Sequence, residues 1–138
     1  MHRFSTTCLA VALFACLMSN VHAGTIDLYE GNNGTQNKIG TITDEAGQSI
    51  NLKKHDDIDN DEARSLTLND VREGAVIKLY DDPKGNANDD DWVEIHVKKS
   101  SQQYTVNTFE KTYEDDFVKV TYHPNNGLDG KVSHIKVD

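Results

Sequence analysis

The sequence predicts an all-β protein, a two-sheet Greek-key sandwich, and three observations support this fold class. Apolar and polar residues alternate in most segments after Gly24, which is the period of a half-buried strand. Clusters of Gly, Asn, Asp and Pro interrupt these segments at short intervals, as turns require. Two pairs of segments also resemble each other, which indicates that one four-strand unit occurs twice.

In the first half, residues 24–72, four segments alternate as strands do. The first is followed by Gly31-Asn32-Asn33-Gly34, which predicts a turn. Residues 60–71 also suit a helix, but Ser65-Leu66-Thr67-Leu68 within this segment alternates, so we expect a strand there. The four expected strands lie at residues 26–28, 39–41, 50–52 and 66–68.

In the second half, residues 73–138, five segments alternate. Asp81-Asp82-Pro83-Lys84-Gly85 and Pro124-Asn125-Asn126-Gly127 predict turns between them. This half is the longer one, and its surplus lies between Asn86 and Asn126. The five expected strands lie at residues 76–80, 93–97, 104–106, 118–122 and 132–137.

The two halves share their beginnings and their ends. Residues 25–34 align without gaps with residues 76–85, and residues 60–68 align in the same way with residues 129–137. A small unit with one apolar face must bury that face against another layer. We therefore expect the halves to pack on each other as a two-sheet Greek-key sandwich.

Residues 1–23 have the organisation of a secretory signal peptide. Arg3 precedes an apolar stretch from Leu9 to Met18, and Val21-His22-Ala23 presents small residues at a cleavage site. We expect cleavage after Ala23 and a periplasmic or secreted protein. A lipoprotein signal around Cys16 is the less favoured alternative, because the preceding Phe14 is bulky for that motif.

The charge balance of the chain restricts its partners. It contains 23 acidic and 14 basic residues, a net charge of -9. Removal of residues 1–23 takes away Arg3 and no acid, which leaves 23 acids against 13 bases. This balance argues against nucleic-acid binding and favours cations or basic proteins. No apolar segment of membrane-spanning length follows the N-terminus, and both cysteines, Cys8 and Cys16, lie in the predicted signal peptide.

Two features of the sequence resemble the βγ-crystallin family, whose domains consist of two Greek-key motifs. They are the opening segments Leu28-Tyr29-Glu30 and Leu79-Tyr80-Asp81, and the two closing segments of the halves. The resemblance covers residues 24–138, with motif one at about 24–72 and motif two at about 73–138. In calcium-binding members, each motif ends in two Asn/Asp residues, two variable residues, Ser or Thr, and Ser. The resemblance therefore implies calcium binding that stabilises the sandwich.

The chain departs from this signature at three positions. Residues 60–65 fit it except at the fifth position, where Arg64 supplies no oxygen ligand and would repel a cation or occupy its place. Residues 129–134 keep Ser133 at the fifth position but have Gly130 second and His134 sixth. The resemblance thus implies one competent calcium site rather than two.

In the family, each motif contributes to the site of the other, which implies a particular ligand set here. Ser133, Asp61 and backbone oxygens near Glu30 and Lys131 would hold the ion. The impaired second site would involve the residues Glu62 and Asp81.

Calcium prefers oxygen ligands in any protein family, and residues 56–62 contain many of them. The alternative interpretation of this segment is a solvated acidic loop. We interpret Asp89-Asp90-Asp91 as a charged loop tip.

Nothing in the sequence singles out a catalytic centre. No serine lies in a nucleophile elbow, and the histidines that follow the signal peptide lack zinc-site spacing. We therefore expect a non-enzymatic protein. An alternative function follows from export and acidity, namely a periplasmic or secreted inhibitor or immunity-type protein that binds a basic enzyme through its acidic surface.

Overall fold

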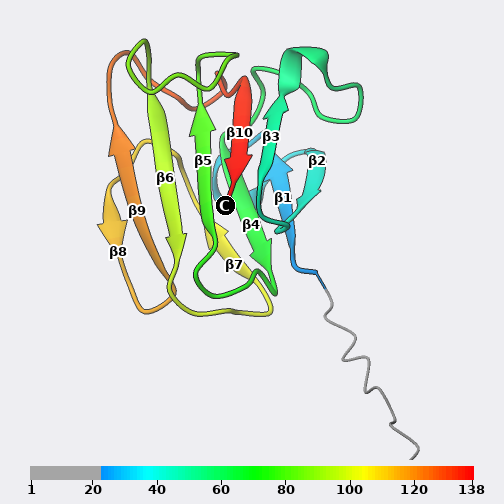
Figure 1. The fold of residues 1–138 in the computed structure, drawn as a ribbon, viewed down its shortest axis with the longest axis vertical. Coiled ribbons are helices and arrows are strands. Elements are labelled where there is room, and N and C mark those ends of the chain that lie inside the picture. The colour runs from blue at the N-terminus through cyan, green and yellow to red at the C-terminus, as the bar shows by residue number, and fades with distance from the viewer. Residues whose placement is uncertain (1–22) are drawn as a thin grey trace, which may run out of the picture.

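The computed structural model describes residues 23–138, which form two antiparallel β-sheets packed face to face (Figure 1). The predicted signal peptide lies outside the described residues, apart from Ala23. Two 3-10 turns, η1 (Asn32–Gly34) and η2 (Leu52–Lys54), accompany the strands. The strands are β1 (Thr25–Tyr29), β2 (Lys38–Thr43), β3 (Gln48–Asn51), β4 (Ser65–Asn69), β5 (Val76–Tyr80), β6 (Trp92–Val97), β7 (Tyr104–Val106), β8 (Tyr113–Glu114), β9 (Val118–His123) and β10 (His134–Val137).

Each half of the chain places one strand in the sheet of the other half. The four-stranded sheet has the order β2-β1-β4-β7, and the six-stranded sheet has the order β3-β10-β5-β6-β9-β8. The third strand of the first half, β3, thus pairs with the last strand of the second, and β7 pairs with β4. This reciprocal exchange is Greek-key connectivity, and it confirms the predicted all-β two-sheet sandwich.

The aligned segments of the two halves pair in the same register. Tyr29 at the end of β1 lies opposite Ser65, and Tyr80 at the end of β5 lies opposite His134. The Arg64 amide donates to the Tyr29 carbonyl at 2.9 Å, and the Ser133 amide donates to the Tyr80 carbonyl at 2.8 Å. Residues that align in the sequence therefore occupy corresponding places in the structure.

The additional residues of the second half add strands to the six-stranded sheet. β9 pairs with β6, and the two-residue strand β8 pairs with β9 at the edge. β8 was not predicted, because two residues are too few to show an alternating pattern. β10 begins at His134 rather than at residue 132, because Gly130 adopts φ 80 and the chain turns before it enters the sheet.

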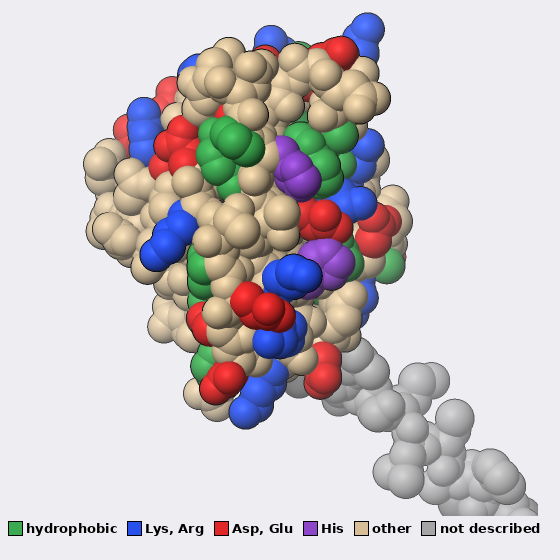
Figure 2. Space-filling model, turned by 90° about the vertical axis from the view of Figure 1, so that its left-hand side faces the viewer, with side chains coloured by type: hydrophobic (Ala, Val, Ile, Leu, Met, Phe, Trp, Pro, Cys, Tyr) green, Lys and Arg blue, Asp and Glu red, His purple; other side chains and the backbone are tan. Residues whose placement is uncertain are grey.

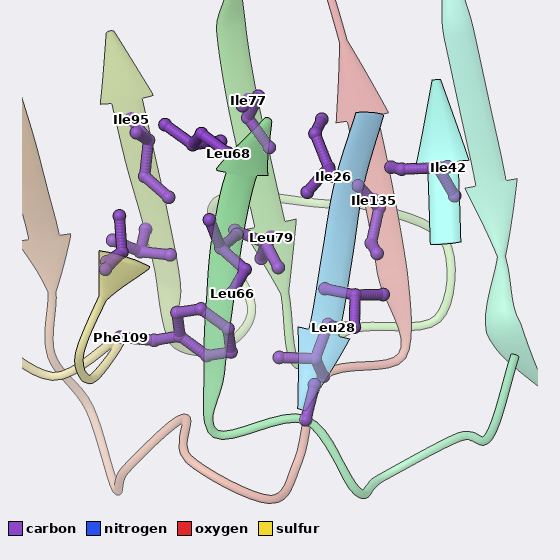
Figure 3. Packing of buried hydrophobic residues seen from close by; sticks show 14 of the residues in the cluster. Ile26, Leu28, Ile42, Leu66, Leu68, Ile77, Leu79, Ile95, Phe109 and Ile135 are labelled. Atoms are coloured by element: carbon purple, nitrogen blue, oxygen red, sulfur yellow. The ribbon is translucent and has the colours of Figure 1, made fainter. Parts of the chain in front are cut away.

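The core lies between the sheets, where the side chains of both inner faces meet (Figure 3). Phe109, which follows β7, is fully buried and closes one side of the core (Figure 3). Burial of such a side chain contributes about 1.5–3 kcal/mol. The residues of the two sheets that meet there are Ile26, Leu28, Leu66 and Leu68 from one and Ile77, Leu79, Ile95 and Ile135 from the other.

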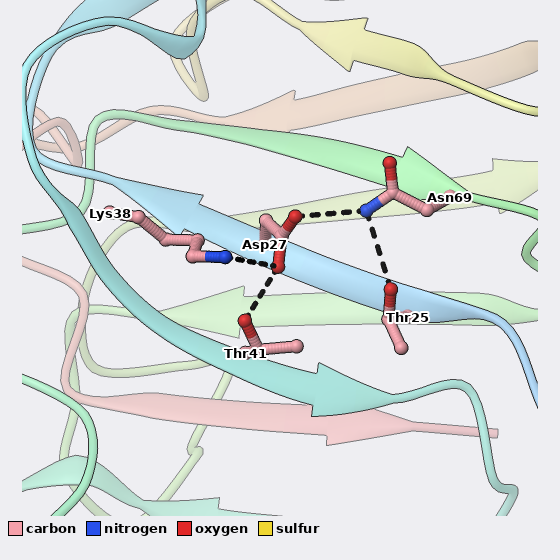
Figure 4. A network of polar contacts seen from close by, with 5 residues as sticks. All are labelled: Thr25, Asp27, Lys38, Thr41 and Asn69. Carbon is pink, nitrogen blue, oxygen red and sulfur yellow. Dashed lines mark hydrogen bonds and ion pairs between the residues drawn. The ribbon is translucent and has the colours of Figure 1, made fainter.

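The outer face of the four-stranded sheet is polar. Asp27 lies between the core residues Ile26 and Leu28 and points the opposite way, as strand geometry requires. It accepts hydrogen bonds from Thr41 and from the Asn69 amide, the latter at 3.0 Å (Figure 4). Within the described part of the chain, no helix has the length and apolar character needed to cross a membrane.

Candidate metal centre

Three loops that carry most of the candidate ligands meet at one end of the sandwich. They are the segment between η2 and β4, the β5–β6 loop and the β9–β10 loop, all at the top of Figure 1. Two backbone hydrogen bonds join the halves there: the Asp61 amide donates to the Val132 carbonyl at 3.1 Å, and the Gly130 amide donates to the Ala63 carbonyl at 2.8 Å. Since Asp61 corresponds to Gly130, and Ala63 to Val132, this crossing is symmetric and creates two corresponding corners.

We call the corner around Ser133 the serine corner. The Ser133 hydroxyl donates to Oδ1 of Asp61 at 2.8 Å and lies 3.5 Å from the Lys131 carbonyl oxygen. Ser133 is buried, whereas Asp61 is exposed and adopts φ 59. A hydroxyl, a carboxylate and a carbonyl from both halves of the chain therefore converge at one point.

We expected the backbone near Glu30 at the serine corner and Asp81 at the second site, but the structure places Asp81 beside Ser133 and Glu30 beside Arg64. β10 pairs with β5, so Ser133 lies beside Tyr80, and Asp81 is the residue that follows Tyr80. The charges of Asp61 and Lys131 both act on the Asp81 carboxyl group. Glu30 follows β1 instead and lies in the other corner.

Asp81 is also part of a carboxylate cluster. Oxygen atoms of Asp81, Asp90 and Asp91 lie within 4.8 Å of one another. Burial and the negative charges of Asp90 and Asp61 together raise the pKa of Asp81 to about 6, while the charge of Lys131 opposes them. Burial and crowded negative charge both disfavour the ionised carboxyl group, and a bound cation would favour it.

Asp91 has a structural role in this cluster. Burial alone would raise its pKa, but hydrogen bonds from the Tyr122 hydroxyl and from the amides of Asn126, Asn125 and Gly127 lower it to about 2. Asp91 is 1% exposed. It therefore fixes the start of the β9–β10 loop against β6.

The interpretation of residues 89–91 as a solvated loop tip is wrong for Asp91. Val93 and Ile95 are buried, and alternate residues of a strand point to the same face. Asp91 is two residues before Val93, so the same rule directs its side chain inward. That signal was present in the sequence. Asp90, half-buried beside it, was likewise not among the expected site residues.

In the second corner, the Arg64 side chain takes the position that corresponds to Ser133. Its Nη1 atom donates to the Glu30 carbonyl oxygen at 2.9 Å. Its guanidinium group packs on Gly130, where an added Cβ would lie 2.8 Å from Nη2. The guanidinium group thus places a positive charge in this corner.

A polar hollow of about 350 Å³ lies beside the second corner. Glu30 and Glu62, two of the expected site residues, line it together with Asp59 and Asn60. The Asn60 Oδ1 atom is buried and has no hydrogen-bond partner among the described residues. Of the six expected site residues, the structure thus places Asp61, Lys131, Ser133 and Asp81 at the serine corner and Glu30 and Glu62 at the Arg64 corner.

Comparison with protein-family models, with curated proteins and with solved structures gives no match for this chain. The function is therefore inferred from the residues of the site and their geometry.

Proposed function

We propose that this chain is an exported, non-enzymatic βγ-crystallin-like protein that binds one calcium ion at the serine corner, and that the ion stabilises the sandwich. The observation that carries the proposal is the contact of 2.8 Å between Ser133 Oγ and Asp61 Oδ1, which joins the two halves of the chain. Export of the protein would supply the calcium, because the ion is abundant outside the cytoplasm.

The serine corner provides a suitable set of oxygen atoms. Calcium takes six to eight oxygen ligands from carboxylates, carbonyls, hydroxyls and water. Asp61 and Asp81 offer carboxylates, Ser133 a hydroxyl and Lys131 a carbonyl. Water would complete the coordination, and the Lys131 amine, whose charge also acts on Asp81, donates to the Asn126 carbonyl at 3.2 Å.

Binding at this place would couple to folding. Asp61 comes from the first half, whereas Lys131 and Ser133 come from the second, so the ligands assemble only when the halves pack together. An ion that binds only the native state stabilises it by about 2.7 kcal/mol when its concentration is 100 times Kd. The effect of calcium on the melting temperature is therefore the direct test.

We expect millimolar calcium to raise the melting temperature relative to chelator, and calorimetry to give one ion per chain. Ser133→Ala should remove most of the increase. Ser101→Ala, in the loop between β6 and β7, is the matched control and should retain it. A melting curve of the native protein that is the same in calcium and in chelator would contradict the proposal.

A second candidate function is the binding of a basic envelope or secreted enzyme. Residues 86–89 form an exposed part of the β5–β6 loop, and Asp89 there accepts a hydrogen bond from the Asn86 amide at 2.7 Å. An exposed carboxylate held in place in this way suits a basic partner. Capture of a secreted enzyme that is released by salt and lost in Asp89→Asn would support this function.

A further inference from the structure

The long second half builds a hollow from residues 104–115. Its volume is about 330 Å³, and it lies beside β7 and β8, the edge strands of the two sheets. This volume lies within the range of small-ligand sites. The residues that line it are Tyr104, Asn107, Thr108, Lys111, Tyr113 and Asp115.

One wall of the hollow is a directed chain of hydrogen bonds. The Tyr104 hydroxyl donates its only proton to Oδ2 of Asp115, so the Tyr113 hydroxyl must be the donor to Tyr104, at 3.0 Å. Asp115 is fixed in turn by the amides of Phe117 at 2.8 Å and Val118 at 2.9 Å. The Tyr113 oxygen is therefore left with a free lone pair, which serves as a hydrogen-bond acceptor of fixed position.

Two other groups of the lining, Asn107 and Lys111, are free to donate. The Asn107 side chain makes no hydrogen bond within residues 23–138, so its amide offers both donors and an acceptor. Lys111 forms no ion pair among the described residues, and its amine lies 5.7 Å from the centre of the Tyr113 ring. The hollow thus combines an aromatic surface with separate donors and acceptors.

The charge around the hollow disfavours an anion. Lys111 is balanced by Asp115 in the lining, and the whole chain carries a net charge of -9. On the side of the molecule that carries β8 and β9, acidic, basic and hydrophobic side chains are interspersed, and neither sign of charge dominates (Figure 2). The ligand chemistry that fits is uncharged and rich in groups that both donate and accept.

We propose that this hollow binds a neutral pyranose sugar. Its hydroxyls would accept from Asn107 and Lys111 and donate to the Tyr113 oxygen. Each hydroxyl is both donor and acceptor, which matches the mixed lining. One sugar ring makes few contacts, so the affinity is in the millimolar range.

The test is a titration of the 15N-labelled protein with glucose, galactose, mannose and N-acetylglucosamine, followed by NMR. At least one sugar should give saturable shifts confined to amides of residues 104–115. Asn107→Ala should weaken this binding by about fivefold, the effect of one lost hydrogen bond. Tyr113→Phe, which keeps the ring and removes the acceptor, should weaken it similarly.

Tyr29→Phe is the matched control, because Tyr29 is half-buried at the end of β1 and does not line the hollow, so it should leave the affinity unchanged. Absence of saturable shifts with all four sugars would overturn the proposal. So would equal affinity in Asn107→Ala and the native protein, or a preference for glucuronate over the neutral sugars.

Discussion

Arg64 and Ser133 occupy corresponding positions in the two halves but face opposite chemistry. Ser133 donates to the Asp61 carboxylate at 2.8 Å, whereas Arg64 donates to the Glu30 carbonyl at 2.9 Å and packs on Gly130. One corner thus holds crowded oxygen atoms that a cation would stabilise. The other corner already contains a positive charge, the guanidinium group of Arg64.

This difference predicts how a second calcium site could be created. Arg64→Ser combined with Gly130→Asp would give the Arg64 corner the serine and the aspartate of the serine corner, with Glu30 in the place of Asp81. Gly130 adopts φ 80, and the corresponding Asp61 already adopts φ 59, so aspartate is tolerated there. We expect calorimetry to change from one ion per chain to two.

Arg64→Ser alone is the control for the double variant, because it removes the guanidinium group without supplying a carboxylate. It should still bind one ion and should be less stable, by about 1 kcal/mol, through loss of the bond to Glu30. A double variant that folds and binds a single ion would show that the two corners are not equivalent.

Asp91 is expected to be the most important carboxylate for stability. Asp91→Asn leaves one acceptor oxygen for four donors, so buried donors lose their partner. We expect a loss of about 3 kcal/mol in the free energy of unfolding, measured with urea in the presence of chelator. Asp89→Asn, two residues earlier and exposed, should change it by less than about 0.5 kcal/mol.

The sequence predicts the architecture well because its signals are periodic and repeated. The correspondence of Tyr29 with Tyr80 follows from the aligned segments, and the structure gives both the same pairing register. The sequence did not predict that Asp81 lies at the serine corner and Glu30 at the Arg64 corner. These positions depend on which strands pair with each other, and the sequence pattern does not specify that pairing. Phe109 also escapes a pattern argument, since it reaches the core from a loop with no period.

The pH dependence of stability should reflect two carboxyl groups with opposite shifts. Asp91 has its pKa lowered to about 2, so its contribution is present above its ordinary value of 3.8 and is lost as the pH falls toward 2. Asp81 has its pKa raised from 3.8 to about 6, so its contribution is complete below 3.8 and is lost as the pH rises through 6.

Without calcium, the free energy of unfolding should therefore decline between about pH 4 and about pH 7. Urea unfolding in chelator at several pH values measures it. Asp81→Asn should flatten this decline, whereas Asp116→Asn should not, because Asp116 belongs to the β8–β9 loop. That loop lies at the opposite end of the sandwich (Figure 1). If the decline persists in Asp81→Asn, titratable groups other than Asp81 cause it.

Gly85 is required by the turn that covers the end of β5. It adopts φ 69, and an added Cβ would lie 2.8 Å from the His134 ring. That ring cannot move aside easily, because Nδ1 donates to the Pro83 carbonyl at 2.8 Å and Nε2 contacts the Ser49 hydroxyl at 2.8 Å. Gly85→Ala therefore combines backbone strain with a steric clash.

We expect Gly85→Ala to lower the free energy of unfolding by about 2–4 kcal/mol, measured by urea denaturation. Gly47→Ala separates the two effects, because Gly47 adopts φ 86 but has no atom within 4 Å of an added Cβ. It should cost only about 1 kcal/mol, the strain alone. Equal losses in both variants would show that the turn shifts away from His134 without cost.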